Sequence, residues 1–335
     1  MLLIRVFNLT CRAFVSLIMG ALLLILTAPV QAQQRPAMYY TDSVGQGRPV
    51  AKDPCVVRFQ GRYLLYYSLL DTEKQNWSIG IAASADLTNW TKVGEMRPEK
   101  DYEGKGICAP GVLLKDGRVH LFYQTYGNGP KDAICHAVAP DGLHFERDAS
   151  NPIFRPTGAW TVGRAIDAEV VAFDHRYLLF FATRDPAYQV QMQGVAATQG
   201  LTTDFGRTTW RQLTDSAVLR PQLPWEKQCV EGASCLRRGR WLYMFYAGAY
   251  NNEPQQIGVA RSLDGVRWQR LADTPLLRNG IPGTWNASES GHPAIFRDED
   301  GRTYLFYQGN NDHGRTWHLS KVEVKWKHGA PYVAP

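Results

Sequence analysis

The sequence predicts an all-β protein, a five-bladed β-propeller with four-stranded antiparallel blades around a central axis. A turn followed by a short aromatic strand recurs at intervals of about sixty residues, and apolar strands recur around each copy. Convincing helical periodicity is almost absent. The turn and strand occur five times, at residues 61–67, 117–123, 175–181, 239–246 and 301–307. The turn contains Gly in every copy except the third, which has His175.

Each repeat is expected to contain four strands in the same order. The first strand precedes the turn, and these strands are expected at residues 54–59, 111–114, 169–173, 233–236 and 293–296. The aromatic copy is the second strand, and third strands are expected at residues 79–84, 134–139, 194–197, 257–262 and 317–322. An outer strand is expected to end at an aromatic residue in four repeats, at Trp90, Phe145, Trp210 and Trp268.

The fifth repeat lacks an obvious outer strand. We expect residues 38–41 to supply it, because pairing the two ends of the chain removes the exposed edge of an open array of sheets. Inter-repeat loops are short except near residues 188–215 and 250–256, which favours a pocket closed by these loops over a long cleft.

The N-terminus has the pattern of a secretory signal peptide over residues 1–32. A positive region precedes a mostly apolar stretch at residues 13–30, and Val30-Gln31-Ala32 is a small-residue cleavage pattern. An uncleaved membrane anchor is the alternative. We therefore expect a secreted or periplasmic protein whose residues 33–335 form a single propeller domain.

Charge and cysteine content exclude several classes of function. The chain has a formal net charge of +6, and residues 1–32 contain Arg5 and Arg12 and no acidic residue, which leaves +4 for the remainder. No Lys/Arg run is longer than Arg237-Arg238, so neither nucleic acid nor a membrane surface is expected as a partner after signal cleavage.

The five cysteines after residue 32 lie in apolar runs, which favours buried thiols over a zinc site. A disulfide bridge between Cys229 and Cys235 is kept as an alternative.

Ionisable residues break the apolar pattern where the first strands open. They are Asp53, Asp167, Glu231 and His292 in the first, third, fourth and fifth repeats, and the second repeat has Ala109 there. First strands of a propeller line its axis, so these side chains are expected at one mouth. Carboxylates gathered there repel one another, and desolvation raises at least one pKa, so that a proton donor and a base coexist. The alternative is that the aspartates bond backbone amides at strand starts.

Two carboxyl groups in different protonation states suit inverting hydrolysis of a glycosidic bond. One carboxylate activates water and one carboxylic acid protonates the leaving oxygen, across roughly 6.5–9.5 Å. Arg164 is a candidate for holding a substrate hydroxyl or carboxylate, or for pairing with an acid. Glu289, Gln308 and Asn310 are placed to reach the mouth, and Arg184-Asp185-Pro186 is interpreted as a turn. Loop tryptophans that could stack on a sugar or only pack are Trp77, Trp160, Trp225 and Trp285.

The segments Lys52-Asp53-Pro54, 165–168 and 230–233 resemble the three signature acids of glycoside hydrolase family 43. The resemblance spans nearly all of residues 33–335. It implies that Asp53 is the general base, that Glu231 is the general acid, and that Asp167 orients Glu231 and tunes its pKa. It also implies that His292 lies on the axis and holds a calcium or sodium ion; a plain hydrogen-bonding histidine is the alternative.

By this resemblance the substrate is a plant or algal oligosaccharide or polysaccharide, cleaved by an exo-acting enzyme similar to arabinofuranosidases or xylosidases, with no required cofactor. His292 and Gln308 are expected beside the substrate together with Arg164, Trp225 and Trp285. Three alternatives stay open: an anhydrogalactosidase-like hydrolase with His292 as the acid, a phosphorylase with Arg164 or Arg184 at a phosphate, and a non-catalytic carbohydrate-binding propeller.

Overall fold

The computed structural model describes residues 36, 38–44, 47–71, 73–202 and 204–334, so the predicted signal peptide at 1–32 lies outside the described residues. The described chain forms one eight-stranded sheet and three four-stranded sheets, which confirms the all-β class. Three short 3₁₀-helices are the helical segments of this part of the chain: η1 (Asp101–Glu103), η2 (Gly129–Lys131) and η3 (Pro224–Glu226). Among the described residues, no helix has the length and apolar character needed to span a membrane.

The eight-stranded sheet contains two antiparallel groups of four strands. They are β1 (Ala51–Phe59), β2 (Arg62–Asp71), β3 (Asn76–Ser84) and β4 (Thr91–Met96), then β5 (Gly106–Lys115), β6 (Arg118–Tyr126), β7 (Ile134–Ala139) and β8 (Glu146–Arg147). The groups join where Trp77 of β3 pairs in parallel with Gly106 of β5. Outside this pair, each group has the pairing pattern of a separate four-stranded sheet.

The other sheets follow in chain order and have the same antiparallel pattern. They are β9 (Ile166–Phe173), β10 (Arg176–Arg184), β11 (Gln191–Ala197) and β12 (Arg211–Gln212); β13 (Val230–Arg238), β14 (Trp241–Gly248), β15 (Gln256–Ser262) and β16 (Gln269–Arg270); and β17 (Glu289–Arg297), β18 (Thr303–Asn310), β19 (His318–Lys327) and β20 (Ala330–Val333).

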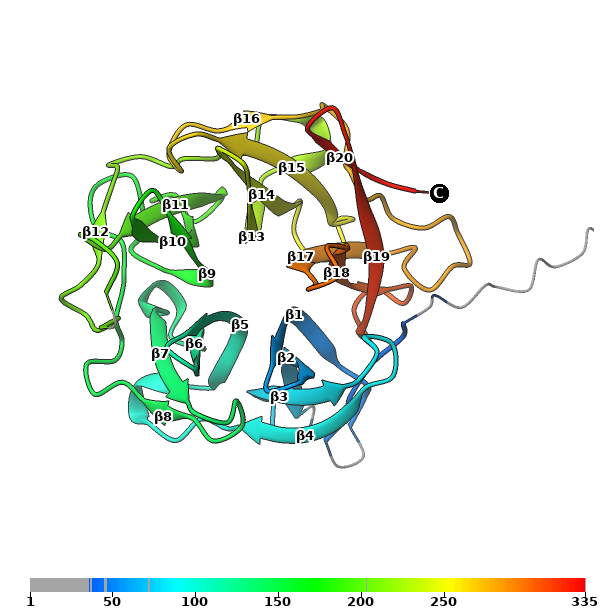
Figure 1. Cartoon of the computed structure of the whole chain (residues 1–335), viewed down its shortest axis with the longest axis horizontal. Helices are drawn as coiled ribbons and strands as arrows, with labels where there is room; N and C mark the ends of the chain where they lie inside the picture. The colour runs from blue at the N-terminus through cyan, green and yellow to red at the C-terminus, as the bar shows by residue number, and fades with distance from the viewer. Residues whose placement is uncertain (1–35, 37, 45–46, 72, 203, 335) are drawn as a thin grey trace, which may run out of the picture. The chain divides into compact units, whose positions relative to one another are not determined.

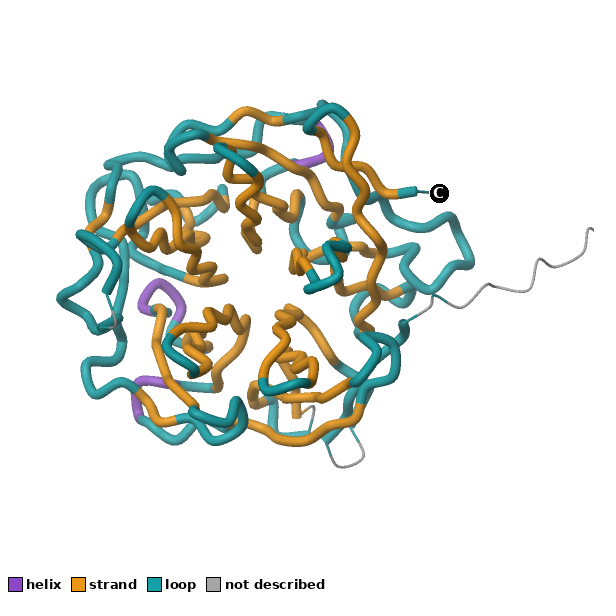
Figure 2. The backbone as a smooth tube through the Cα atoms, viewed as in Figure 1, coloured by secondary structure: helices purple, strands orange, loops and turns teal. Residues whose placement is uncertain are grey.

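The first strands of the repeats lie around a common centre, as Figure 1 shows. They contact one another in cyclic order: β1 with β5 and β17, β5 with β9, β9 with β13, and β13 with β17. Figure 2 shows the same arrangement, with strands innermost and most connecting loops toward the periphery. Residues that open these strands are therefore brought together although they are far apart in sequence.

The predicted first strands start three to five residues too late. In the structure they begin at Ala51, Gly106, Ile166, Val230 and Glu289. The cause is a register shift inside each pairing with the second strand, for example between Lys52 and Cys55 of β1. Such a bulge breaks the two-residue side-chain alternation on which strand prediction depends.

The aromatic residues predicted to end the outer strands instead precede them. Strand β4 begins directly after Trp90, and β8, β12 and β16 likewise follow Phe145, Trp210 and Trp268. The reason is that each aromatic ring packs against the second strand of the preceding repeat. The ring pairs are Trp90 with Phe306, Phe145 with Tyr66, Trp210 with Phe122 and Trp268 with Phe180.

The predicted closure by residues 38–41 is found as a local contact. Tyr40 forms an antiparallel bridge with Leu319 of β19, with N···O distances of 2.9 and 2.7 Å. Buried Met38 accepts a hydrogen bond from Ser320 through its backbone oxygen. The other end of β19 pairs with β20, a strand that the sequence analysis did not predict.

The cysteines of the described chain are free. Cys229 and Cys235 are not bonded to each other, and Cys55, Cys108 and Cys135 are likewise thiols. A disulfide between Cys229 and Cys235 is therefore absent from the structure. Cys108, Cys135 and Cys229 are buried thiols as predicted, whereas Cys55 and Cys235 are partly exposed.

A buried ionic network ties the segment before β13 to its own sheet. Glu226, whose side chain has no exposed surface, accepts hydrogen bonds from Arg270 Nε at 2.7 Å and from Tyr246 Oη at 2.6 Å. Its Oε2 also accepts the backbone N–H groups of residues 222 and 223. The same arrangement occurs before β5 with Glu103, Arg147 and Tyr123.

Arg270→Ala is expected to destabilise the fold by about 3–5 kcal/mol, because it leaves the carboxylate of Glu226 buried without its cation. Urea unfolding at equilibrium measures this change. Arg267→Ala is the matched control, since the Arg267 side chain is 92% exposed and its removal is expected to cost less than about 0.5 kcal/mol. A loss below about 1 kcal/mol for Arg270→Ala would contradict the structural role of this network.

Candidate active site

Each first strand contains one residue with a positive φ angle at its bulge. These are Asp53 (φ 50°), Ala109 (φ 49°), Asp167 (φ 55°), Gly232 (φ 58°) and His292 (φ 45°). Such angles are uncommon for residues other than glycine and cluster where side chains serve a function. At Gly232 a Cβ atom would lie 3.2 Å from the His292 ring, so glycine leaves room for the imidazole.

The bulges are held by hydrogen bonds from the second strands of neighbouring repeats. The N–H of Asp53 donates to Gln308 Oε1 at 2.9 Å, and the N–H of Asp167 donates to Gln124 Oε1 at 2.8 Å. The N–H of Ala109 donates to Ser68 Oγ at 2.8 Å. Sequence reasoning found Gln308 and missed Ser68 and Gln124. The signal was available, because all three directly follow the tyrosine that ends an aromatic repeat strand.

His292 lies between the two aspartates. Its Nε2 is 3.5 Å from Asp53 Oδ1 and 3.4 Å from Asp167 Oδ1. Burial alone would lower the pKa of His292, but the charges of Asp53, Asp167 and Glu231 outweigh it and raise the pKa to about 9. The imidazole is therefore a cation at neutral pH and offsets the repulsion between the carboxylates.

Asp53 is held in its ionised form. Burial would raise its pKa, but the charges of His292 and Lys52 and the hydrogen bond from Ser68 together lower it below its usual value. Ser68 Oγ donates to Asp53 Oδ2 at 2.6 Å while accepting the N–H of Ala109. A buried, ionised carboxylate with a fixed orientation is suited to accept a proton from water.

The pKa of Glu231 is shifted in the opposite direction. Burial and the charge of Asp167 raise its pKa, although His292, Gln255 and Lys52 act against that rise. Its Oε1 accepts a hydrogen bond from Gln255 Nε2 at 2.6 Å, and its Oε2 accepts one from Gln191 Nε2. Two carboxyl groups whose environments move their pKa values apart are the pattern expected of a base and an acid.

Lys52 is a site residue whose part sequence reasoning missed. Its Nζ donates to Asn251 Oδ1 at 2.9 Å and lies 4.4 Å from the centre of the Trp317 ring. Burial would lower its pKa, but the charges of Asp53, Glu289 and Glu231 raise it, so the amine stays protonated among these acids. Glu289 is fully buried, and burial raises its pKa to about 8 against the opposing effects of Lys52, Gln308 and Asn252.

Arg164 reaches the same site from the loop before β9. Its Nη1 donates to Gln191 Oε1 at 3.5 Å, so it touches the amide that contacts Glu231. Its Nε also lies 3.6 Å from Asp132 Oδ2. The structure thus contains the predicted pairing with an acid, and a contact of Arg164 with substrate stays a prediction.

The loop tryptophans share a packing position. Trp225 lies over Gly248 and Gly258, where an added Cβ would be 2.3 and 2.7 Å from its ring, and it stacks on Tyr246. Trp285 packs over Gly309 and beside Tyr307 in the same way. Both residues are partly exposed. Trp160 packs likewise over Gly194, so this position serves packing in several repeats, and sugar stacking stays a prediction.

An ion held through Nε2 of His292 stays a prediction. That atom faces two carboxylates, at 3.5 Å from Asp53 Oδ1 and 3.4 Å from Asp167 Oδ1. Within the described ranges, no group of three or more His, Cys, Asp or Glu side chains could hold a metal. The space at the centre, lined among others by Asp167, Glu169 and His292, is about 20 Å³.

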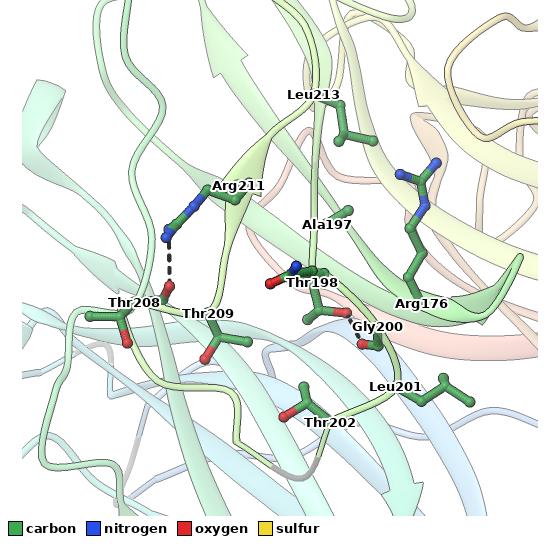
Figure 3. Close-up of a pocket in the computed structure, with 11 residues that line it drawn as sticks. Arg176, Ala197, Thr198, Gly200, Leu201, Thr202, Thr208, Thr209, Arg211 and Leu213 are labelled. Carbon is green, nitrogen blue, oxygen red and sulfur yellow. Dashed lines mark hydrogen bonds between the residues drawn. The ribbon is translucent and has the colours of Figure 1, made fainter.

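Larger pockets lie elsewhere and contain none of the predicted site residues. A pocket of about 510 Å³ is lined by Thr198, Thr202, Thr209, Arg211 and neighbouring residues, as Figure 3 shows. A second, of about 550 Å³, lies beside Arg155 and shares Arg211 with the first. Arg211 Nη1 donates to the backbone oxygen of Thr208 at 2.9 Å. Because neither pocket is lined by an Asp, Glu or His side chain, the chemistry is assigned to the converging first strands.

Comparison with known proteins agrees with this geometry. The model of the family "Glycosyl hydrolases family 43" matches residues 41–331. A thermostable family-43 glycoside hydrolase superposes with a TM-score of 0.68 at 20% identity, covering 88% of this chain and 96% of that one. An endo-1,4-beta-xylanase from Bacteroides thetaiotaomicron gives 0.67 at 20% identity, covering 85% and 94%. An alpha-L-arabinofuranosidase from Lactobacillus brevis gives 0.67 at 18% identity, covering 84% and 94%.

Proposed function

Since the chain belongs to glycoside hydrolase family 43 and is a glycosidase, we propose that it hydrolyses its glycosidic bond with inversion, through Asp53 and Glu231. Asp53 removes a proton from the attacking water as the water bonds to the anomeric carbon. Glu231 gives its proton to the departing glycosidic oxygen. Asp167 holds His292 and raises the pKa of Glu231 through its charge.

The observation that carries this mechanism is that two buried carboxyl groups at one site have pKa values shifted in opposite directions. The charges of His292 and Lys52 lower the pKa of Asp53, while burial and the charge of Asp167 raise the pKa of Glu231. His292 is less suited to be the acid, because its Nε2 faces two carboxylates. We also propose that the fold has five blades, one for each first strand in the ring of contacts. The N-terminal segment is proposed to direct export of the mature domain.

The substrate class that we propose is a plant or algal oligosaccharide, cleaved by an exo-acting enzyme similar to arabinofuranosidases or xylosidases. The names of two structural relatives, an alpha-L-arabinofuranosidase and an endo-1,4-beta-xylanase, support these sugars. The loops at residues 188–215 and 250–256 support a closed pocket, since Tyr250 Oη donates to the backbone oxygen of Gln189 at 3.0 Å.

Sugar release from arabinan, xylan, galactan, fructan and agar oligosaccharides, with and without phosphate, tests this proposal. We expect release that needs no phosphate, and a product whose anomeric configuration by NMR is opposite to that of the substrate. Release only in the presence of phosphate would favour the phosphorylase alternative. Retention of configuration would contradict the roles of Asp53 and Glu231.

His292→Gln is expected to move the acidic limb of the kcat/KM profile to higher pH by about one to three units. Loss of the imidazolium removes a charge that lowers the pKa of Asp53, so the base becomes protonated at a higher pH. Lys52 and Ser68 remain and limit the rise. His144→Gln is the control, because the His144 side chain is 87% exposed on a turn. An acidic limb that does not move in His292→Gln would contradict the charge coupling.

A further inference from the structure

Arg184 is a cation at the same site, and the mechanism proposed above assigns it no role. It is the last residue of β10, and its guanidinium contacts two aromatic rings, 4.4 Å from the centre of Tyr188 and 5.0 Å from that of Tyr250. Its Nε donates to Gln191 Oε1 at 3.1 Å, and its Nη1 to the backbone oxygen of Tyr188 at 3.4 Å. Within the described chain no carboxylate lies within 4.0 Å of it, and its Nη2 has no acceptor.

The neighbouring acid does not neutralise this charge. Asp185 Oδ1 accepts the N–H groups of Gln189 at 2.7 Å and Val190 at 2.9 Å, so it serves the turn that carries Tyr188. Arg164, which reaches the same Gln191, is by contrast paired with Asp132. Arg184 is partly exposed and is thus a planar cation that contacts two tyrosine rings and has no acidic partner among the described residues.

The position of Arg184 relative to Glu231 determines which part of a substrate it meets. Gln191 joins the two, accepting from Arg184 and donating to Glu231. In inverting hydrolysis the acid lies on the side of the departing group, and the nucleophile attacks from the opposite face. Arg184 thus borders the leaving group, which argues against a role in binding a phosphate nucleophile.

We propose that Arg184, held by Tyr188 and Tyr250, binds an oxyanion carried by the leaving-group part of the substrate, so that this glycosidase acts on acidic glycans. The oxyanion is the carboxylate of a uronic acid or a sulfate ester, since a guanidinium presents its donors in a planar fork that matches both. The inference rests on the proposed function, because it takes Glu231 as the acid.

The binding test uses the mature protein carrying Asp53→Asn, so that substrate is not consumed. Its affinity is measured by calorimetry for arabinan, oligogalacturonide and sulfated agar-type trisaccharides. We expect an acidic ligand to bind at least tenfold more tightly than the neutral one, with an affinity that falls as salt rises. Arg184→Gln should remove this preference, and Arg267→Gln, which deletes an exposed arginine, should keep it. A preference for only one acidic ligand identifies carboxylate or sulfate as the anion.

The kinetic test uses the linkage that the protein cleaves, with a neutral or an acidic sugar on the leaving-group side. Arg184→Gln is expected to reduce kcat/KM for the acidic substrate by about 10–100-fold more than for the neutral one, mainly through KM. Arg184→Lys should behave similarly, because an ammonium lacks the planar fork.

Equal losses on neutral and acidic substrates would overturn the inference, since Arg184 would then only position Gln191 and Glu231. Equal affinity for neutral and acidic ligands would overturn it as well, as would activation by inorganic phosphate that Arg184→Gln abolishes. Each of these results is compatible with hydrolysis of a neutral glycan. They therefore differ from a failure of the proposed function, in which inverting hydrolysis would be absent.

Discussion

Asp53→Asn is expected to reduce kcat/KM by about 10²- to 10⁴-fold on every substrate, whatever its leaving group. An amide cannot take the proton of the attacking water, whereas the ionised carboxylate can. The substitution keeps the size of the side chain and an oxygen that accepts the Ser68 hydrogen bond. Asparagine also tolerates the positive φ of this residue.

A matched control separates chemistry from backbone strain. Asp174 has the same φ of 50° on an exposed turn, so Asp174→Asn makes the same exchange away from the site. We expect it to retain wild-type kinetics and thermal stability. Azide should partly rescue Asp53→Asn by attacking the anomeric carbon in place of water, releasing a glycosyl azide of inverted configuration. Activity of Asp53→Asn near that of the wild type would contradict the assignment of the base.

The sequence predicted the order of strands because the aromatic second strand is a strong repeated signal. It misplaced the start of each first strand, since residues such as Asp53 and His292 sit at bulges that interrupt the alternation of side chains. It also misjudged the outer strands. Residues such as Trp90 look like strand ends in a linear pattern, but their rings pack across to the preceding repeat, and a contact of that kind has no local signature.

The candidate site divides in a similar way. Asp53, Asp167, Glu231 and His292 could be found because charge breaks an apolar strand at the same place in several repeats. The residues that hold two of these carboxyl groups in place by hydrogen bonds are neutral amides and a hydroxyl, such as Gln191, Gln255 and Ser68. Their effect depends on which sheet they face across the ring of first strands, so it followed only from the three-dimensional arrangement.

Glu231→Gln is expected to lower kcat/KM by about 10²- to 10⁴-fold on natural linkages and much less on substrates with good leaving groups. An oligosaccharide leaving group needs a proton as the bond breaks, whereas a dinitrophenolate departs without one. The amide keeps an oxygen to accept from Gln191 or Gln255. Comparison of dinitrophenyl glycosides with unactivated oligosaccharides measures this difference, and Glu146→Gln on an exposed outer strand is the control.

The pH dependence of the same variant gives an independent test. Burial and Asp167 raise the pKa of Glu231, so in the wild type activity is lost as pH rises and the acid is deprotonated. Glu231→Gln cannot lose this proton, and the basic limb should disappear from the profile. Glu289 and His292 also titrate, with pKa values of about 8 and about 9, so Glu289→Gln is measured in parallel. A basic limb that survives in Glu231→Gln and vanishes in Glu289→Gln would assign the titrating group to Glu289. Equal losses of kcat/KM on good and poor leaving groups would contradict Glu231 as the acid.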